Sequence, residues 1–310
     1  MAKYIIEAEE VQFEYPDGTK ALKGLSLAIK EGQKVAILGS NGAGKSTLFL
    51  HFNGILRPQR GKIRFAGKDV RYDHAFLMNL RKNVGIVFQD PDTQLFSASV
   101  FQEISFGPLN LGLSEDLVRQ RVNEAMVATE ITDLQHKPTH FLSYGQKKRV
   151  SIADVLAMGP AVLIFDEPTA CLDPMLTCHI MELFDRISQK GKTVILSTHD
   201  VDMAYSWADY IFVLKDGTVA GEGPPEKVFQ DEGLLRQTDL TTPWLVEVCC
   251  ELKNRGWLAP DAPIPRTKKE FFECIQSEGD FSGRRYLPAT NSGETLRQRS
   301  SSLKIVKGSC

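Results

Sequence analysis

The hydrophobic pattern along this chain predicts strands that alternate with helices. Residues 35–38, 161–165 and 193–197 are short, almost wholly apolar runs, which is typical of parallel strands buried on both faces. Longer stretches between them carry apolar residues at helical spacing. This alternation predicts an α/β fold built on a mostly parallel sheet.

The pattern changes before this core and again inside it. Residues 4–37 have the composition of strands and turns. Residues 95–140 are mostly helical in pattern, with Ser114 as a candidate N-cap ahead of an apolar stripe. We therefore expect one large domain over residues 1–240, with a helical subdomain inserted at about 92–150.

The composition shifts again beyond Pro225. Short helical stretches at 242–249 and 268–274 predict a C-terminal helical extension over residues 241–281, which could be a small packed module or a dimer face. Residues 282–310 are rich in Ser, Arg and Gly and net basic, so we expect a disordered tail. A basic tail can touch a membrane surface, but a solvated terminus is the simpler interpretation.

Composition and charge narrow the class of protein. The 310 residues are 42% hydrophobic and 25% charged, as in a globular protein with a sizeable core, and the net charge of −2 argues neither for nor against a nucleic-acid partner. The N-terminus lacks the apolar core of a signal peptide, and no run is long enough to span a bilayer. We expect a cytoplasmic chain unless a partner holds it at a membrane. The six cysteines lack C-x-x-C spacing, so we expect reduced thiols and no zinc site.

Residues 39–47 match the phosphate-loop template G-x-x-x-x-G-K-[ST] between a strand-like run and a helix-like stretch. Small residues let backbone N–H groups surround phosphate oxygens, and the next helix offers its positive dipole end. Lys45 would reach the β- and γ-phosphates, and the Ser46 hydroxyl would ligate Mg²⁺. The predicted nucleoside-triphosphate site comprises Gly39, Ser40, Asn41, Gly42, Ala43, Gly44, Lys45, Ser46 and Thr47.

Polar residues follow the other buried runs. Asp166 and Glu167 come directly after 161–165, and His199 follows 193–197. The carboxyl ends of parallel strands share one edge of a sheet, so we expect these side chains beside the phosphate loop. Asp166 would hold Mg²⁺, Glu167 would polarise the attacking water as a general base, and His199 would sense the γ-phosphate. Gln89, after another short strand, would reach Mg²⁺ or the lytic water.

Two further positions have two interpretations each. Tyr15 could stack on an adenine ring, although composition alone favours a half-buried strand tyrosine. Ser143 is a candidate N-cap for a helix whose free N–H groups would suit an anion; taken alone, it marks only a well-capped helix.

In this order the motifs resemble the ATP-binding-cassette (ABC) family: the phosphate loop, Gln89, Leu-Ser-x-Gly-Gln at 142–146, a strand into Asp166-Glu167, Leu172-Asp173 and His199. The resemblance covers residues 4 to about 240. It implies a RecA-like phosphate-loop NTPase core with an N-terminal antiparallel β subdomain. It also implies that Tyr15 stacks on adenine, that Leu172-Asp173 carries information across a dimer, and that Gln89 couples the site to a membrane partner.

The resemblance also gives the segment at 142–146 its role. It implies that this segment completes the ATP site of a facing subunit, in trans, through Leu142, Ser143, Gly145 and Gln146. The family usually has glycine where this chain has Tyr144. We therefore expect Tyr144→Gly to leave activity the same or higher.

Within the family, residues 88–96 and 106–113 resemble the ATPases of energy-coupling-factor importers, and most of all the cobalt and nickel branch. That resemblance implies a second ATPase subunit, identical or related, a transmembrane coupling protein and a separate substrate-binding membrane protein. The chain would then lie at the cytoplasmic face of the cell membrane, with ATP and Mg²⁺ as its ligands and no nucleic acid as partner. An importer for a vitamin is the alternative.

Two other classes of function are weaker. A soluble ABC protein acting on ribosomes or DNA typically has two cassettes or a long coiled coil, and neither is present. A phosphate-loop kinase would not need the segment at 142–146 or Leu172-Asp173. The sequence thus favours an ATP-driven transporter motor in which Glu167 polarises water for in-line attack on the γ-phosphoryl group.

Overall fold

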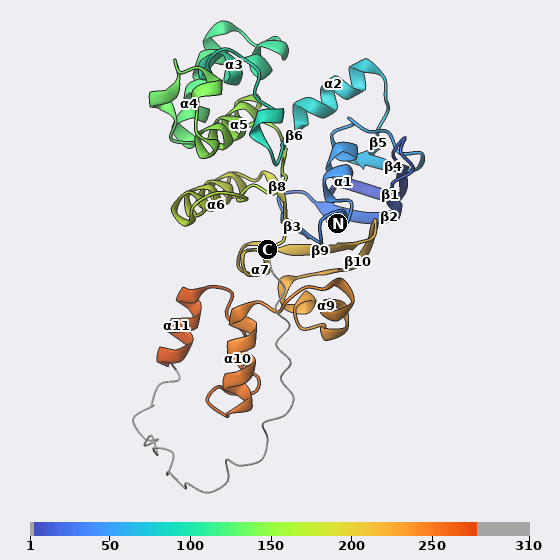
Figure 1. The fold of residues 1–310 in the computed structure, drawn as a ribbon, viewed down its shortest axis with the longest axis vertical. Helices are drawn as coiled ribbons and strands as arrows, with labels where there is room; N and C mark the ends of the chain where they lie inside the picture. Colours follow the sequence, from blue (N-terminus) through green and yellow to red (C-terminus); the bar gives the residue numbers. More distant parts are fainter. Residues whose placement is uncertain (1–2, 278–310) are drawn as a thin grey trace, which may run out of the picture.

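A computed structural model of the chain describes residues 3–277 (Figure 1). Its centre is a six-stranded sheet in the order β10-β9-β3-β8-β7-β6, in which every neighbouring pair is parallel except β9 and β10. This confirms the α/β class and the mostly parallel sheet. The strands are β3 Lys34–Leu38, β6 Val84–Val87, β7 Val162–Phe165, β8 Thr193–Thr198, β9 Tyr210–Lys215 and β10 Thr218–Gly223.

The strand order brings distant segments to one edge of this sheet. β3 lies between β8 and β9, although β8 follows it by more than 150 residues along the chain. In the parallel register Leu38 pairs with Thr198, and Phe165 pairs with Val87 and Leu196. The carboxyl ends of β3, β6, β7 and β8 are therefore aligned, and the loops that leave them meet.

A second, antiparallel sheet has the order β2-β1-β4-β5. Helix α1 lies between the two sheets, because Leu48, Phe49 and Phe52 share one buried core with residues of β1, β2 and β3. The apolar face of α1 is thus covered from both sides, which fixes the helix that follows the phosphate loop. The strands are β1 Tyr4–Glu14, β2 Lys20–Lys30, β4 Arg60–Phe65 and β5 Lys68–Asp69.

The helices follow the predicted periodicity. Both predicted N-cap positions are confirmed, but only Ser143 caps through its side chain, in a full capping box with Gln146 at the start of α5. Ser114 precedes α4 without a side-chain cap hydrogen bond. The α-helices are α1 Lys45–Phe52, α2 His74–Asn83, α3 Val100–Asn110, α4 Glu115–Ala128, α5 Tyr144–Met158, α6 Pro174–Gln189, α7 Val201–Trp207, α8 Pro225–Val228, α9 Glu232–Thr238, α10 Trp244–Asn254 and α11 Lys268–Ser277. Short 3-10 helices span Pro91–Thr93, Thr132–Leu134 and Thr139–Phe141.

Helices α3, α4 and α5 pack around an apolar core of their own at one end of the molecule (Figure 1). Val122 and Met126 of α4 and Val150 of α5 are fully buried in it. One face of α5 therefore belongs to this helical group, while Ile152 and Val155 on another face of the same helix join the core of the central sheet. Helix α5 connects the two parts.

Helices α10 and α11 lie at the opposite end of the molecule (Figure 1). Leu245 and Val246 of α10 and Phe271 of α11 join the core that contains Tyr205 and Trp207 of α7. None of the helices between residues 3 and 277 combines the length and the apolarity that crossing a bilayer requires. The predicted tail at 282–310 lies outside the described residues.

Candidate active site

The phosphate loop joins β3 to α1, which confirms the strand–turn–helix context that the template requires. Gly39 has φ 150° and Gly44, the N-cap of α1, has φ 103°. A Cβ on Gly39 would lie 2.4 Å from the Leu214 carbonyl oxygen, and one on Gly44 would lie 2.7 Å from that of Ala21. Glycine is needed at both places for two reasons. A Cβ would clash with neighbouring backbone, and the positive φ angles are unfavourable for other residues.

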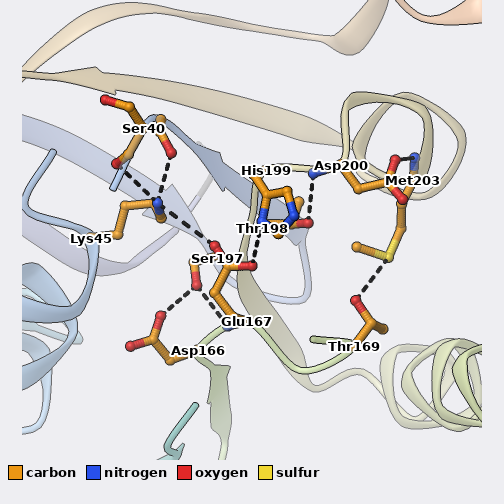
Figure 2. A network of polar contacts seen from close by, with 11 residues as sticks. Ser40, Lys45, Asp166, Glu167, Thr169, Ser197, Thr198, His199, Asp200 and Met203 are labelled. Carbon is orange, nitrogen blue, oxygen red and sulfur yellow. Dashed lines mark hydrogen bonds and ion pairs between the residues drawn. The ribbon is translucent and has the colours of Figure 1, made fainter. Parts of the chain in front are cut away.

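The Lys45 ammonium group is buried at the centre of the loop (Figure 2). Its Nζ donates to the carbonyl oxygens of Gly39, at 2.7 Å, and Ser40, at 3.2 Å. The same Nζ lies 3.7 Å from Oε1 of Glu167, whose side chain is 9% exposed. A charge held by backbone carbonyls and one carboxylate is in place to meet an anionic ligand.

Asp166 and Glu167 leave β7 side by side and are tied to β8 by Ser197 (Figure 2). The Ser197 hydroxyl donates to Oδ1 of Asp166 at 2.5 Å and accepts the backbone N–H of Glu167 at 2.9 Å. Glu167 has φ 44°, in the left-handed region that non-glycine residues seldom occupy. Ser197 thus holds the Asp166 carboxylate and the Glu167 backbone, a role that the sequence does not reveal.

His199 lies on the other side of the Glu167 carboxylate (Figure 2). Its Nδ1 is 3.0 Å from Oε2, and the His199 side chain is 74% exposed. An ionised carboxylate only accepts, so Nδ1–H is the donor in this pair. Oε1 is buried and has no hydrogen-bond partner within 3–277, although it faces Lys45. Glu167 is therefore held at its outer oxygen, while its inner oxygen faces Lys45 without a hydrogen bond from any described residue and can accept one from a water.

Tyr15 is brought to the first turn of α1. Its hydroxyl lies 3.1 Å from Oγ1 of Thr47, and its ring meets the ring of Phe13 edge to face, with centroids 5.0 Å apart. Residue 15 thus stands beside the phosphate loop. Stacking on adenine stays a prediction.

The segment at 142–146 forms the N-terminus of α5 and is separate from the phosphate loop. A pocket of about 280 Å³ beside Ser143 is lined by Gly145, Gln146 and Arg149 and by the Cys171–Asp173 turn. None of residues 39–47, all of which the structure describes, line this pocket. A Cβ on Gly145 would lie 2.7 Å from the side chain of Leu176, so α6 packs directly against this turn of α5. In this pocket the segment at 142–146 faces the Cys171–Asp173 turn and not the phosphate loop.

Gln89 is connected to α5 by contacts that the sequence does not reveal. Tyr144 Oη donates to the Gln89 carbonyl oxygen at 3.2 Å, and Lys148 Nζ donates to the same oxygen at 2.9 Å. Tyr144 and Lys148 are four residues apart and so share one face of the helix. Only their i, i+4 spacing on a predicted helix could have suggested a common partner.

The residues of this edge suit a magnesium ion. No group of three or more His, Cys, Asp or Glu side chains able to hold a metal occurs in the part of the chain that the structure describes. Mg²⁺ does not need such a cluster, because one or two protein oxygens, phosphate oxygens and water complete its shell. The Asp166 carboxylate next to the loop is an oxygen ligand of the right kind, as is the Ser46 hydroxyl at the start of α1.

The comparisons with known proteins decide the family. Residues 22–170 match the family model for ABC transporters. The energy-coupling factor transporter ATP-binding protein EcfA of Methanocaldococcus jannaschii is 50% identical over 240 residues, which are 77% of this chain and 86% of that protein. This chain belongs to the ABC transporter family, as an ATP-binding subunit of the energy-coupling factor type. It is an ATPase that binds ATP.

Solved structures place this ABC ATPase among known cassettes. CbiO1 of Clostridium perfringens, part of the ABC transporter complex CbiONQ, is 49% identical with a TM-score of 0.68, over 81% of this chain and 99% of that one. The cassette MJ0796, in a dimeric post-hydrolysis state bound to ADP and Pi, is 30% identical with a TM-score of 0.66, over 71% of this chain and 99% of that one. The family resemblance and the fold expected from the sequence are confirmed.

Proposed function

We propose that this ABC ATPase is the motor subunit of an energy-coupling-factor importer for cobalt or nickel ions. The observation that carries its chemistry is the buried Glu167 carboxylate between Lys45 and the exposed His199, with one carboxylate oxygen beside the loop that has no hydrogen bond from the described residues. That oxygen is where a carboxylate would accept a proton from an attacking water.

In the proposed mechanism ATP phosphates occupy the loop of residues 39–47, and Lys45 exchanges its carbonyl partners for phosphate oxygens. Glu167, oriented by Ser197 and His199, accepts the proton of the water that attacks the γ-phosphoryl group in line. Mg²⁺, held by Ser46, Asp166 and Gln89, would neutralise charge on the phosphate oxygens.

The second half of the site would come from a partner ATPase. The pocket beside Ser143 lacks phosphate-loop residues, so we infer that Leu142, Ser143, Gly145 and Gln146 meet the ATP of a facing subunit. The capped helix start of α5 leaves N–H groups that suit a γ-phosphate, which supports this pairing. Leu172-Asp173, which lines the same pocket, would lie at that interface.

An exposed apolar patch supports a membrane partner. Phe96 and Phe106 form an edge-to-face pair, with centroids 4.8 Å apart, and both are largely exposed along with Leu109. The patch lies seven to twenty residues beyond Gln89 along the chain, on and before α3. We propose that a transmembrane coupling protein docks here, that a separate membrane protein binds the substrate, and that the ATPase lies on the cytoplasmic face of the membrane.

The decisive test of the motor is Glu167→Gln. An amide cannot act as the base, so we expect ATP to bind while kcat falls at least about a hundredfold, within the usual size of general-base effects. The variant should accumulate as an ATP-bound dimer in sedimentation. Glu130→Gln is the matched control, because Glu130 also pairs with a histidine, at 3.7 Å, but outside the site. A Glu167→Gln variant that hydrolyses ATP near the wild-type rate would refute the assignment.

The substrate is tested separately, because an ATPase subunit does not touch it. Cells that contain the complete transporter should take up cobalt or nickel in a manner that depends on Glu167. Uptake of a vitamin instead, with the same dependence, would establish the alternative and leave the motor assignment intact.

A further inference from the structure

The turn that carries Gln89 is attached to α5 at several points in succession. Lys148 Nζ donates to the carbonyl oxygens of Phe88, at 2.8 Å, and Gln89, at 2.9 Å, and the Tyr144 hydroxyl donates to that of Gln89. Lys147 Nζ lies 2.6 Å from Oδ1 of Asp92. Three side chains from the first two turns of α5 therefore hold one short segment.

The side chain of Gln94 closes this arrangement from the turn itself. Its Oε1 accepts the backbone N–H of Phe88 at 3.2 Å, and its Nε2 donates to the Ser151 carbonyl oxygen at 3.0 Å and to Asp154 at 3.2 Å. The strand end before Gln89 and the middle of α5 are thus joined as well. Residues 88–94 lie along α5 as one unit.

Lys148 gives this attachment its strength. The residue is completely buried, and the oxygens that its ammonium group reaches are those of Phe88 and Gln89. A buried charge without partners is costly, so separating the turn from α5 would leave this charge unsatisfied. Keeping these contacts therefore requires the two elements to move together.

Tyr144 adds a contact at the functional end of the helix. Burial raises the pKa of Tyr144, and the nearby Cys171, Asp90 and Asp92 raise it further, so its hydroxyl remains a donor at neutral pH. Tyr144 directly follows Ser143, the N-cap. A displacement of the Gln89 carbonyl would therefore act on Tyr144. Its neighbour Ser143 is the residue that we propose contacts the ATP of the partner subunit.

From this geometry we infer that Tyr144 is a positioning residue. Its hydroxyl, with Lys148, fixes Gln89 to the start of α5. As a result, Gln89 in one ATP site and Ser143 in the other shift as one body. The inference rests on the proposed function, because it links two sites that a pair of subunits would share. A glycine at position 144 cannot make this contact. The sequence-based expectation for Tyr144→Gly left the contact out, and we now expect that variant to lose activity.

The test is a double-mutant cycle between Tyr144→Phe and Gln89→Ala, measured on the full chain at saturating Mg-ATP. Tyr144→Phe removes only the hydroxyl, and loss of one hydrogen bond should lower kcat about two- to tenfold. Gln89→Ala removes the side chain that the Tyr144 hydrogen bond positions. It keeps the backbone carbonyl that accepts this hydrogen bond. Tyr144→Phe should therefore lower Tm equally in the wild-type and Gln89→Ala backgrounds, but should lower kcat only in the wild-type background.

Tyr72→Phe is the matched control, because the Tyr72 hydroxyl also donates to a backbone carbonyl, that of Leu56, at 3.2 Å. It should change Tm but not kcat. A Tyr144→Phe effect on kcat that is absent, or that adds fully to that of Gln89→Ala, would overturn the inference and leave only a structural contact. A wild-type chain without any ATPase activity would instead refute the proposed function, so the two failures are distinguishable.

Discussion

Two of the non-glycine residues with a left-handed backbone lie near the proposed site. Glu167 has φ 44° and Cys171, four residues later, has φ 62°. For a residue with a Cβ the left-handed region costs about 1–2 kcal/mol. At Glu167 the hydrogen bond from its N–H to Ser197 holds the conformation and aims the carboxylate at Lys45. Cys171 is exposed and lines the pocket beside Ser143, where its φ requires only a tight turn.

We expect Cys171→Gly to stabilise the fold, because glycine adopts this φ without a Cβ clash. The gain should be about 0.5–1 kcal/mol, since the relieved strain exceeds the entropy that an added glycine costs the folded state. Thermal unfolding by circular dichroism measures it. Cys171→Ala is the control: it removes the thiol but keeps the Cβ, so Tm should not rise. An equal rise in both variants would assign the effect to the thiol instead of the backbone.

At the scale of elements, α5 is the helix on which the site depends. Its N-terminus carries the capping box, its first turns hold the Gln89 turn, and its middle holds Gln94 through Asp154. Burial raises the pKa of the Asp154 carboxyl to about 7, and the nearby Glu103 raises it while the Gln94 hydrogen bond lowers it. Helix α5 thus contains an acid that titrates near neutral pH.

From this pKa we expect the free energy of unfolding to depend on pH. The folded chain binds the Asp154 proton up to about pH 7, whereas the unfolded chain releases it near 3.8. The stability that the neutral acid contributes is therefore full below about pH 4 and is lost as the pH rises to 7. Asp154→Asn stays neutral throughout, so its Tm should exceed that of the wild type by several degrees at pH 8 and approach it at pH 5.

Asp261→Asn, at an exposed position, is the control for Asp154→Asn. It should give the same Tm difference at both pH values. If Asp154→Asn shows a constant offset from pH 5 to pH 8, the carboxyl of Asp154 does not titrate in this window.

At the scale of the whole molecule, α10, α11 and the segment between them are fixed to α7. Arg266 donates to the carbonyl oxygens of Tyr205, at 3.0 Å, and Ala208 at the end of α7, and it lies 3.6 Å from Glu226. The backbone N–H of Trp244 donates to Asp202 in the first turn of α7. Because α7 follows His199 directly, this C-terminal part supports the strand end that carries the histidine.

We expect Arg266→Ala to lower Tm by roughly 3–8 °C, because it leaves the last carbonyl groups of α7 without their charged donor. Arg255→Ala is the matched control: Arg255 lies in the same part of the chain, but its guanidinium forms an exposed i, i+4 pair with Glu251. Scanning calorimetry of the full chain measures both. Equal shifts in the two variants would mean that the contact with α7 contributes nothing specific.

By itself, the sequence determined those features that depend on residues close together in the chain. The phosphate loop, the N-caps Ser114 and Ser143 and the buried strands follow from local dihedral, capping and periodicity rules, so their context and the fold class could be predicted. The meeting of the loop, Asp166, Glu167 and His199 at one edge followed from the general rule for parallel strands. The roles of these residues in ATP binding and hydrolysis remain predictions, which the variants above test.

Only the tertiary structure decided the contacts between distant segments. Ser197 binds Asp166 and Glu167, Tyr144 and Lys148 hold Gln89, and Arg266 holds α7, each across 30 residues or more. A serine, a tyrosine or an arginine forms such bonds with any carbonyl or carboxylate that the fold brings within 3 Å or so, and sequence spacing does not encode which one that is. The chain specifies its chemistry locally, and the packing of α5 and α7 decides how that chemistry is held.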